Sequence, residues 1–184
     1  MIAVDQLAVM FGATPLFTNV CFNINKKDRI ALVGKNGAGK STLLKILSGS
    51  QKASSGSVAI EKEATIGYLS QVMVLSDDHT VIEETEKAFA DIRDLQQRIE
   101  RENQELANRD DYESQDYLEL VERFAHDNDR FQLMGGLNYR AQMERTLLGL
   151  GFVHEDFNRP TKEFSVGWRM RIELAKILLR RPDI

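Results

Sequence analysis

One nine-residue stretch, GKNGAGKST from Gly34 to Thr42, limits the possible folds of this 184-residue chain more than any other. It follows the apolar run RIALV and precedes LLKILSG, where Gly49 is placed to close a short helix. The spacing of Gly34, Gly39, Lys40 and Ser41 fits the phosphate-binding loop that joins a strand to a helix. A glycine-rich turn that matches by chance is the alternative, and the flanking strand and helix patterns argue against it.

The residue types of this loop suit a triphosphate. Gly37 and Gly39 let the backbone curl so that successive N–H groups point inward, and the helix that begins near Lys40 adds its positive end. Lys40 brings a cation to the β- and γ-phosphates, and Ser41 offers a hydroxyl to Mg²⁺. The predicted binding residues are Gly34, Lys35, Asn36, Gly37, Ala38, Gly39, Lys40, Ser41 and Thr42. The loop by itself predicts a nucleoside triphosphate and does not select the base.

Strand patterns surround the loop. The segments IAVDQLAVMF and LFTNVCFNI, separated by a turn at 12–15, predict an antiparallel hairpin. RIALVG has the continuous apolar character of a buried central strand, and SVAIE and TIGYLSQ predict two further strands. Lys27 stands in a turn where glycine is common.

The character of the chain changes after Thr80, because 81–134 contains no glycine or proline. Its apolar spacing predicts two antiparallel amphipathic helices joined by NRDDYES. The predicted inward residues are Ala88, Ile92, Leu95, Ile99 and Leu106, with Glu102 among them, and Tyr117, Val121, Phe124 and Phe131, with Asn128 among them. The polar residues in this seam predict either a device that sets the register or a loosely packed tip.

Two more helices are expected, over 139–150 and over 165–180. Ser165 is a good N-cap for the second of these, whose predicted apolar face consists of Met170, Leu174, Ile177 and Leu178. Taken alone, this is better interpreted as an ordinary capped helix than as a second anion site.

The order of these motifs carries more information than any of them alone. A phosphate loop, GYLSQ, a helical insert and SVGWRMR resemble the ATP-binding cassette superfamily, in which 164–168 is the place of the signature Leu-Ser-Gly-Gly-Gln. Trp168 in place of the glutamine, followed by RMR, resembles the ABC-F branch of soluble ATPases, many of which act on the ribosome. The resemblance implies an α/β P-loop cassette with an antiparallel β-subdomain and a helical subdomain. The expected divisions are a nucleotide-binding core at 1–80, a helical subdomain at 81–164 and the signature helix at 165–184.

The resemblance also implies roles for residues outside the loop. Phe11 is placed to stack on adenine, with a strand-end core residue as the alternative, and Gln71 matches the glutamine that senses Mg²⁺ and the γ-phosphate. The metal contacts are thus expected at Ser41 and Gln71, with ATP and Mg²⁺ as cofactors. The signature residues expected to contact ATP in a facing cassette are Ser165, Val166, Gly167 and Trp168. Val166 replaces a glycine, which is tolerable only if the position is helical.

In the family, the Walker B aspartate and the catalytic glutamate follow the position of RRPDI, so no catalytic residue is expected within these 184 residues. The chain is predicted to be the first part of the first cassette of a longer protein. It is expected to bind ATP without turning it over, and the intact protein to hydrolyse it with a second cassette of the same chain.

Charge and composition bear on the partners. Residues 83–130 contain 16 acidic against 7 basic residues, which makes direct RNA binding by the hairpin doubtful and leaves a basic ribosomal protein or a purely solvated subdomain as alternatives.

No signal peptide or membrane span is recognised, so a cytoplasmic protein is expected. His79, His126 and His154 lack metal-ligand spacing and are predicted to be surface residues. The competing functions are the ATP-binding subunit of an ABC transporter and a non-catalytic binding module.

Overall fold

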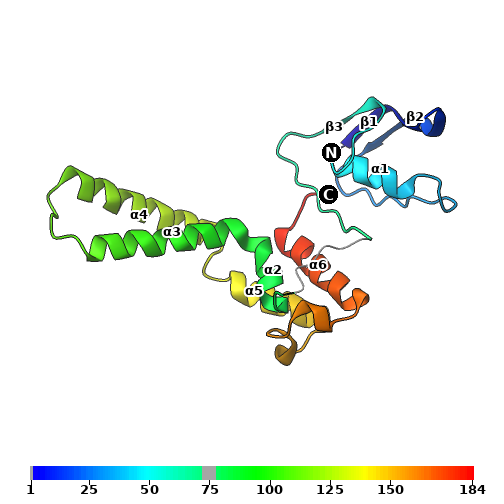
Figure 1. The fold of residues 1–184 in the computed structure, drawn as a ribbon. Helices are drawn as coiled ribbons and strands as arrows, with labels where there is room; N and C mark the ends of the chain where they lie inside the picture. Colours follow the sequence, from blue (N-terminus) through cyan, green and yellow to red (C-terminus); the bar gives the residue numbers. More distant parts are fainter. Residues whose placement is uncertain (1, 72–77) are drawn as a thin grey trace. The chain divides into compact units, whose positions relative to one another are not determined.

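The computed structural model describes residues 2–71 and 78–184, which form two compact units (Figure 1). The sheet unit comprises the chain up to Leu69 together with Arg181–Ile184, and the helical unit comprises Ser70–Arg180. Residues 165–180 of the expected signature division lie in the helical unit and 181–184 in the sheet unit.

The sheet unit contains three antiparallel strands in the order β2-β1-β3. They are β1 (Ile2–Phe11), β2 (Thr14–Ile24) and β3 (Ser55–Ile60). The predicted hairpin is confirmed, and its turn contains Gly12 with a φ of 61°. The strand predicted at SVAIE is also confirmed. Apolar side chains of β1 face inward and form the core of this unit together with helix α1 (Lys40–Leu47).

Two strand predictions are wrong. In the described part of the chain, residues 29–34 form no strand, and the side chains of Ile30 and Val33 are 60% and 84% exposed. Residues 65–71 form none either, although Thr65 and Gly67 make two backbone hydrogen bonds to Ile184, of 3.1 Å and 2.8 Å. An apolar run becomes a strand only where another strand satisfies its N–H and C=O groups, and the three-stranded sheet does not reach these segments.

The helical unit contains α2 (Val81–Glu86), a 3₁₀ turn at Lys87–Phe89, and then α3, α4, α5 and α6. Their bounds are Ala90–Ala107, Gln115–Leu133, Tyr139–Gly149 and Val166–Arg180. All the predicted helices are confirmed. No described helix is both long enough and apolar enough to cross a membrane.

The inward face of α6 differs from the prediction. Its buried residues are Ile172, Ala175 and Leu179, whereas Leu178 is 51% exposed. Met170, Leu174 and Ile177 are half-buried. This helix carries apolar residues on two faces, so the spacing alone could not decide which face enters the core. The core itself joins α2, α5 and α6 with the segment that contains Phe152 and Phe157.

Helices α3 and α4 lie side by side as the predicted antiparallel hairpin (Figure 1). The inward face of α3 is confirmed, with Ile92, Leu95 and Glu102 buried. On α4 the buried residues are Leu120 and Asp127, so the inward role predicted for Val121 is wrong, and Asn128 is only half-buried.

Each buried acid of the hairpin is paired with an arginine of the opposite helix. Glu102 of α3 lies 3.3 Å from Nε of Arg123, and Asp127 of α4 forms an ion pair with Arg98. Glu102, a predicted seam residue, thus helps to cross-link the two helices, which favours the register-setting alternative over a loosely packed tip. Asn128 does not, because its side chain donates to Phe124 O of its own helix at 2.7 Å.

The turn that follows β2 holds a strained residue. Lys27 has a φ of 68° between Asn25 and Asp28, whose side chain accepts a hydrogen bond from Asn25 N at 2.8 Å. A left-handed conformation costs a non-glycine residue about 1–2 kcal/mol. Glycine at this position would avoid that cost, but its greater freedom in the unfolded chain would offset part of the gain in stability.

We expect Lys27→Gly to raise the free energy of unfolding of the sheet unit by about 0.5–1 kcal/mol. Urea denaturation followed by circular dichroism would measure the change. Lys26→Gly is the matched control, because Lys26 does not have a positive φ and should lose stability instead. Equal effects of the two variants would contradict the strain at Lys27.

Candidate functional site

The loop from Gly34 to Thr42 is folded around the side chain of its own lysine. Lys40 Nζ donates hydrogen bonds of 2.8 Å to the carbonyl oxygens of Gly34 and of Lys35. A turn is closed by Ala38 N donating to Lys35 O at 3.2 Å, and the first bond of α1 joins Leu43 N to Gly39 O at 2.9 Å. The loop thus curls over the start of α1 with the ammonium group inside the curl.

Gly39 makes this close approach possible. It is the N-cap of α1 with a φ of 92°, and a Cβ atom here would lie 2.9 Å from both Leu16 Cδ2 and Phe17 Cδ1 of β2. Gly37 has a φ of 82°, but a Cβ atom added there would have no atom within 4 Å. Backbone conformation therefore favours glycine at both positions, and packing against β2 also demands it at Gly39.

The electrostatics of the loop suit an anion. The first N–H groups of α1 have no partner within the helix, and its first turn contains no acidic residue. The positive end of the helix and the ammonium group of Lys40 act in the same direction. The hydroxyl-bearing residues Ser41 and Thr42 follow immediately, and Ser41 is exposed. These groups fit a polyphosphate with a bound divalent cation.

Two other residues predicted to contact the nucleotide are also exposed. Phe11 ends β1 and is 62% exposed, so the alternative of a core residue is wrong, and its stacking on adenine stays a prediction. Gln71 is exposed and belongs to the helical unit, and its contact with Mg²⁺ likewise stays a prediction.

The predicted signature segment forms the start of α6. Val166 is the first residue of this helix, which meets the condition under which valine is tolerable, and it is 69% exposed. Ser165 precedes it, and its carbonyl oxygen accepts from Arg169 N at 2.9 Å. A Cβ atom added to Gly167 would meet nothing within 4 Å, so no packing within the chain requires glycine there. The segment is thus a helix start open to solvent.

A family model described as "ABC transporter" matches residues 17–184. The chain belongs to the ABC transporter family. The resemblance drawn from the motifs is therefore confirmed, and such cassettes bind ATP and are generally ATPases.

Curated relatives match the whole chain, which spans 25–35% of the length of each. YdiF of Bacillus subtilis is 34% identical over 184 residues, 28% of that protein. ABC transporter F family member 2 of Arabidopsis thaliana is 30% identical over 188 residues, 27% of that protein. Both alignments cover 100% of this chain.

Solved cassettes have the same fold. The structure titled "ATP binding subunit of ABC transporter" matches with a TM-score of 0.62 and 18% identity over 99% of this chain and 63% of that one. The dimeric MJ0796 cassette gives a TM-score of 0.62 and 18% identity over 99% of this chain and 71% of its own. The expected cassette fold is confirmed.

Trp168 of this cassette is anchored in an aromatic cluster. Its ring centroid lies 4.9 Å from that of Phe152 and 6.4 Å from that of Phe164, and the Arg171 guanidinium lies 4.3 Å from the ring centre. Arg171 Nη1 also donates to Leu150 O at 2.9 Å. These contacts fix the first turn of α6 on its own unit, so Trp168 has a packing role beside the signature role predicted for it.

A further polar cluster in the cassette was not found from the sequence. Glu84 of α2 is buried, and its carboxylate binds Lys176 of α6 as well as Lys87 and His79. His79, predicted to be a surface residue, is consequently half-buried. A signal was present, because Glu84 shares a helical face with Val81 and Ala88, where an unpaired carboxylate would be costly.

We expect Gly39→Ala to lower the free energy of unfolding of the sheet unit by about 2–3 kcal/mol, because it adds a clash with β2 to the cost of a left-handed residue. Gly37→Ala is the matched control and should cost only about 1–2 kcal/mol, because space surrounds it. Urea denaturation without nucleotide measures both. An equal cost would mean that Leu16 and Phe17 do not constrain the loop.

Replacing Trp168 by alanine should lower the free energy of unfolding of the helical unit by about 3 kcal/mol, because it empties the aromatic cluster. Trp168→Phe keeps a ring there and should cost about 1 kcal/mol. Circular dichroism during thermal unfolding separates the two. A cost below about 1 kcal/mol for the alanine variant would argue against the anchor.

Proposed function

We propose that this chain is the Mg·ATP-binding part of an ABC-F type ATPase. The curl of Gly34–Thr42 around Lys40 at the start of α1 carries the proposal. The backbone N–H groups of this loop would hold the phosphates, Lys40 would neutralise the β- and γ-phosphates, and Ser41 and Gln71 would contact Mg²⁺. Phe11, exposed at the end of β1 in the same unit, would stack on the base.

The start of α6 would serve a second nucleotide. Ser165, Val166, Gly167 and Trp168 would face the γ-phosphate of ATP held by another cassette, as the ABC family pattern implies. Support comes from the exposure of Val166 and from the open space around Gly167, which leave room for a ligand from outside the chain. Trp168 would act from the aromatic cluster that holds the helix start in place.

Hydrolysis is proposed for the intact protein, to which this chain would contribute the residues that bind the triphosphate. Mg²⁺ would supply charge neutralisation at the phosphates when bound. The residues of this chain would bind and orient the triphosphate, which by itself permits binding without turnover.

The proposed cellular role is action on the ribosome, in translation regulation or ribosome protection, by a cytoplasmic protein with two cassettes in one chain. The sequence GWRMR at the start of α6 supports the ABC-F branch, as do relatives whose names place them in the F family. The acidic hairpin of α3 and α4 would then meet a basic protein rather than RNA, since 16 of its charged residues at 83–130 are acids and 7 are bases.

A second candidate is the ATP-binding subunit of a membrane transporter. The solved cassettes with the same fold favour it, because their titles name ABC transporters. The two candidates share the nucleotide site and differ in the partner.

The test uses the intact protein and its Lys40→Ala variant. We expect the variant to lose ATP affinity at least tenfold, since it removes the ammonium group that the loop carbonyls hold inside the curl. It should also lose co-sedimentation with ribosomes in the presence of a slowly hydrolysed ATP analogue. Lys45→Ala is the matched control, because Lys45 is exposed in the last turn of the same helix.

Nucleotide-dependent co-sedimentation that disappears only in Lys40→Ala would support the ribosome role. ATP binding without any co-sedimentation would reject that role and favour the transporter candidate. Unchanged ATP affinity in Lys40→Ala would reject the nucleotide site itself.

A further inference from the structure

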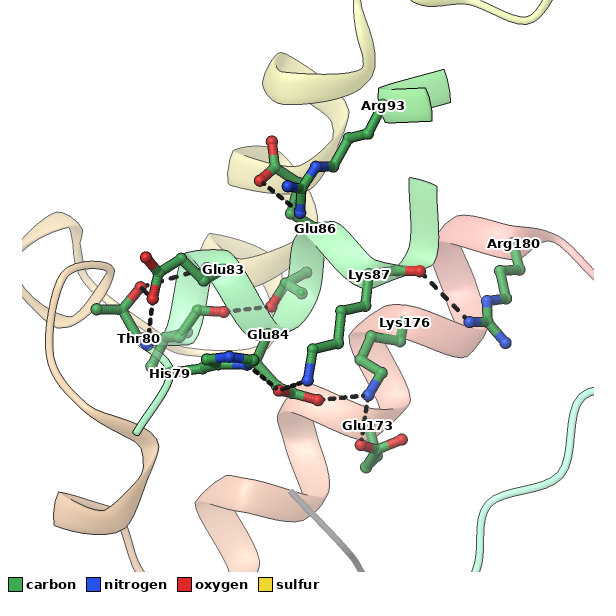
Figure 2. A network of polar contacts seen from close by, with 12 residues as sticks. His79, Thr80, Glu83, Glu84, Glu86, Lys87, Arg93, Glu173, Lys176 and Arg180 are labelled. Carbon is green, nitrogen blue, oxygen red and sulfur yellow. Dashed lines mark hydrogen bonds and ion pairs between the residues drawn. The ribbon is translucent and has the colours of Figure 1, made fainter. Parts of the chain in front are cut away.

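A single buried carboxylate joins two helices of the helical unit. Glu84 of α2 is 1% exposed, and Figure 2 shows its two oxygens directed toward separate cations. Oε1 accepts from Lys176 Nζ of α6 at 2.9 Å, and Oε2 accepts from Lys87 Nζ at 2.5 Å and lies 3.2 Å from His79 Nδ1. Lys176 is therefore the partner of Glu84 that comes from α6.

This pair is held in a constrained geometry. The Lys176 side chain is only 13% exposed, and it also donates to Glu173 of its own helix at 2.6 Å. Burial raises the pKa of a carboxyl group, but the hydrogen bonds from Lys176, Lys87 and His79 outweigh this and hold the pKa of Glu84 below its ordinary value. Glu84 is thus a carboxylate with fixed partners at neutral pH.

The surroundings of the pair are apolar. Val81 of α2 belongs to the same buried cluster as Ile172, Ala175 and Leu179 of α6. At the far end of α6, Arg180 Nη2 makes a longer contact of 3.5 Å with Lys87 O (Figure 2). The close-packed apolar cluster holds the two helices together. The charge pair, with both carboxylate oxygens occupied, adds a directional contact between them. The pair is thus the directional side-chain contact between the middle of α6 and α2.

The orientation of α6 matters because the helix begins at Val166, directly after Ser165. We propose that Glu84 is a positioning residue which, through Lys176, sets the orientation of α6 and thereby aims Ser165 and Gly167 at the nucleotide of a facing cassette. This inference rests on the proposed function, since it gives the signature segment its ligand. Glu84 itself touches no nucleotide.

A purely stabilising role is the competing explanation. A buried ion pair can often be replaced by apolar residues of similar volume without loss of stability, and such a replacement removes the directional contact. The double variant Glu84→Met with Lys176→Met separates the two roles for this reason. Lys87 and His79 are each about 40% exposed at their side chains and can turn to solvent in this variant.

The experiment measures steady-state ATP hydrolysis and ATP affinity in the intact protein for four variants. They are Glu84→Gln, the double methionine variant, Lys176→Arg and, as the matched control, Glu173→Gln. Glu173 binds the same ammonium group from within α6 and cannot connect that helix to α2. Thermal unfolding of each variant is recorded in parallel.

We expect Glu84→Gln and the double methionine variant to lower kcat about tenfold while ATP affinity at the Lys40 loop changes less than about twofold. Lys176→Arg keeps the charge pair and should retain most of kcat, and Glu173→Gln should stay within about twofold of the parent. The double methionine variant should unfold at a temperature close to that of the parent, which makes the result informative even if Glu84→Gln does not fold.

Full kcat in a folded double methionine variant would overturn the proposal, because the helices would then be placed by packing alone. An equal loss in Glu173→Gln would also overturn it, because the charge on Lys176 rather than its link to α2 would be responsible. Failure of the proposed function would give a different result, namely unchanged ATP hydrolysis in Lys40→Ala.

Discussion

The packing of α1 against the three-stranded sheet is the constraint on which the phosphate loop depends. Leu43 and Ile46 bury the helix in the core of the sheet unit, and Gly39 brings its first turn against the side chains of β2. A movement of the helix start would disturb both of these contacts. The curl around Lys40 is consequently presented by a rigid support, which is the arrangement that an anion site with backbone ligands requires.

The helical unit holds the proposed signature segment by a different means. The first turn of α6 is held by the aromatic cluster around Trp168, and its middle is held by the ion pair with α2. Apolar contacts supply most of the burial there. A few directional hydrogen bonds and ion pairs further restrict the orientation of α6. The proposed contact of this segment with a nucleotide of another cassette would require such a fixed orientation.

The sequence predicted the helices and the hairpin strands, because their signals are local. It failed at 29–34 and 65–71, where an apolar run becomes a strand only through a neighbour that local pattern does not reveal. It also chose the wrong face of α6, since apolar residues occur on two faces of that helix. The loop at Gly34–Thr42 was recognised from its specific spacing, although the strand expected before it does not form, and its nucleotide contacts stay a prediction. Glu84 was missed because its partner on α6, Lys176, lies 92 residues away in the sequence, so the link between the two helices is not visible locally.

The crossed ion pairs of the long hairpin have a mechanical consequence. Arg98 faces Asp127, and one turn further along α3 Glu102 faces Arg123. Sliding one helix by a turn would bring Glu102 beside Asp127, and sliding it the other way would bring Arg98 beside Arg123. Either movement replaces attraction by repulsion, so the two helices are coupled as a single stiff lever. A force applied at the tip around Tyr112 would then displace the base of the hairpin, because α3 and α4 would not slide along each other.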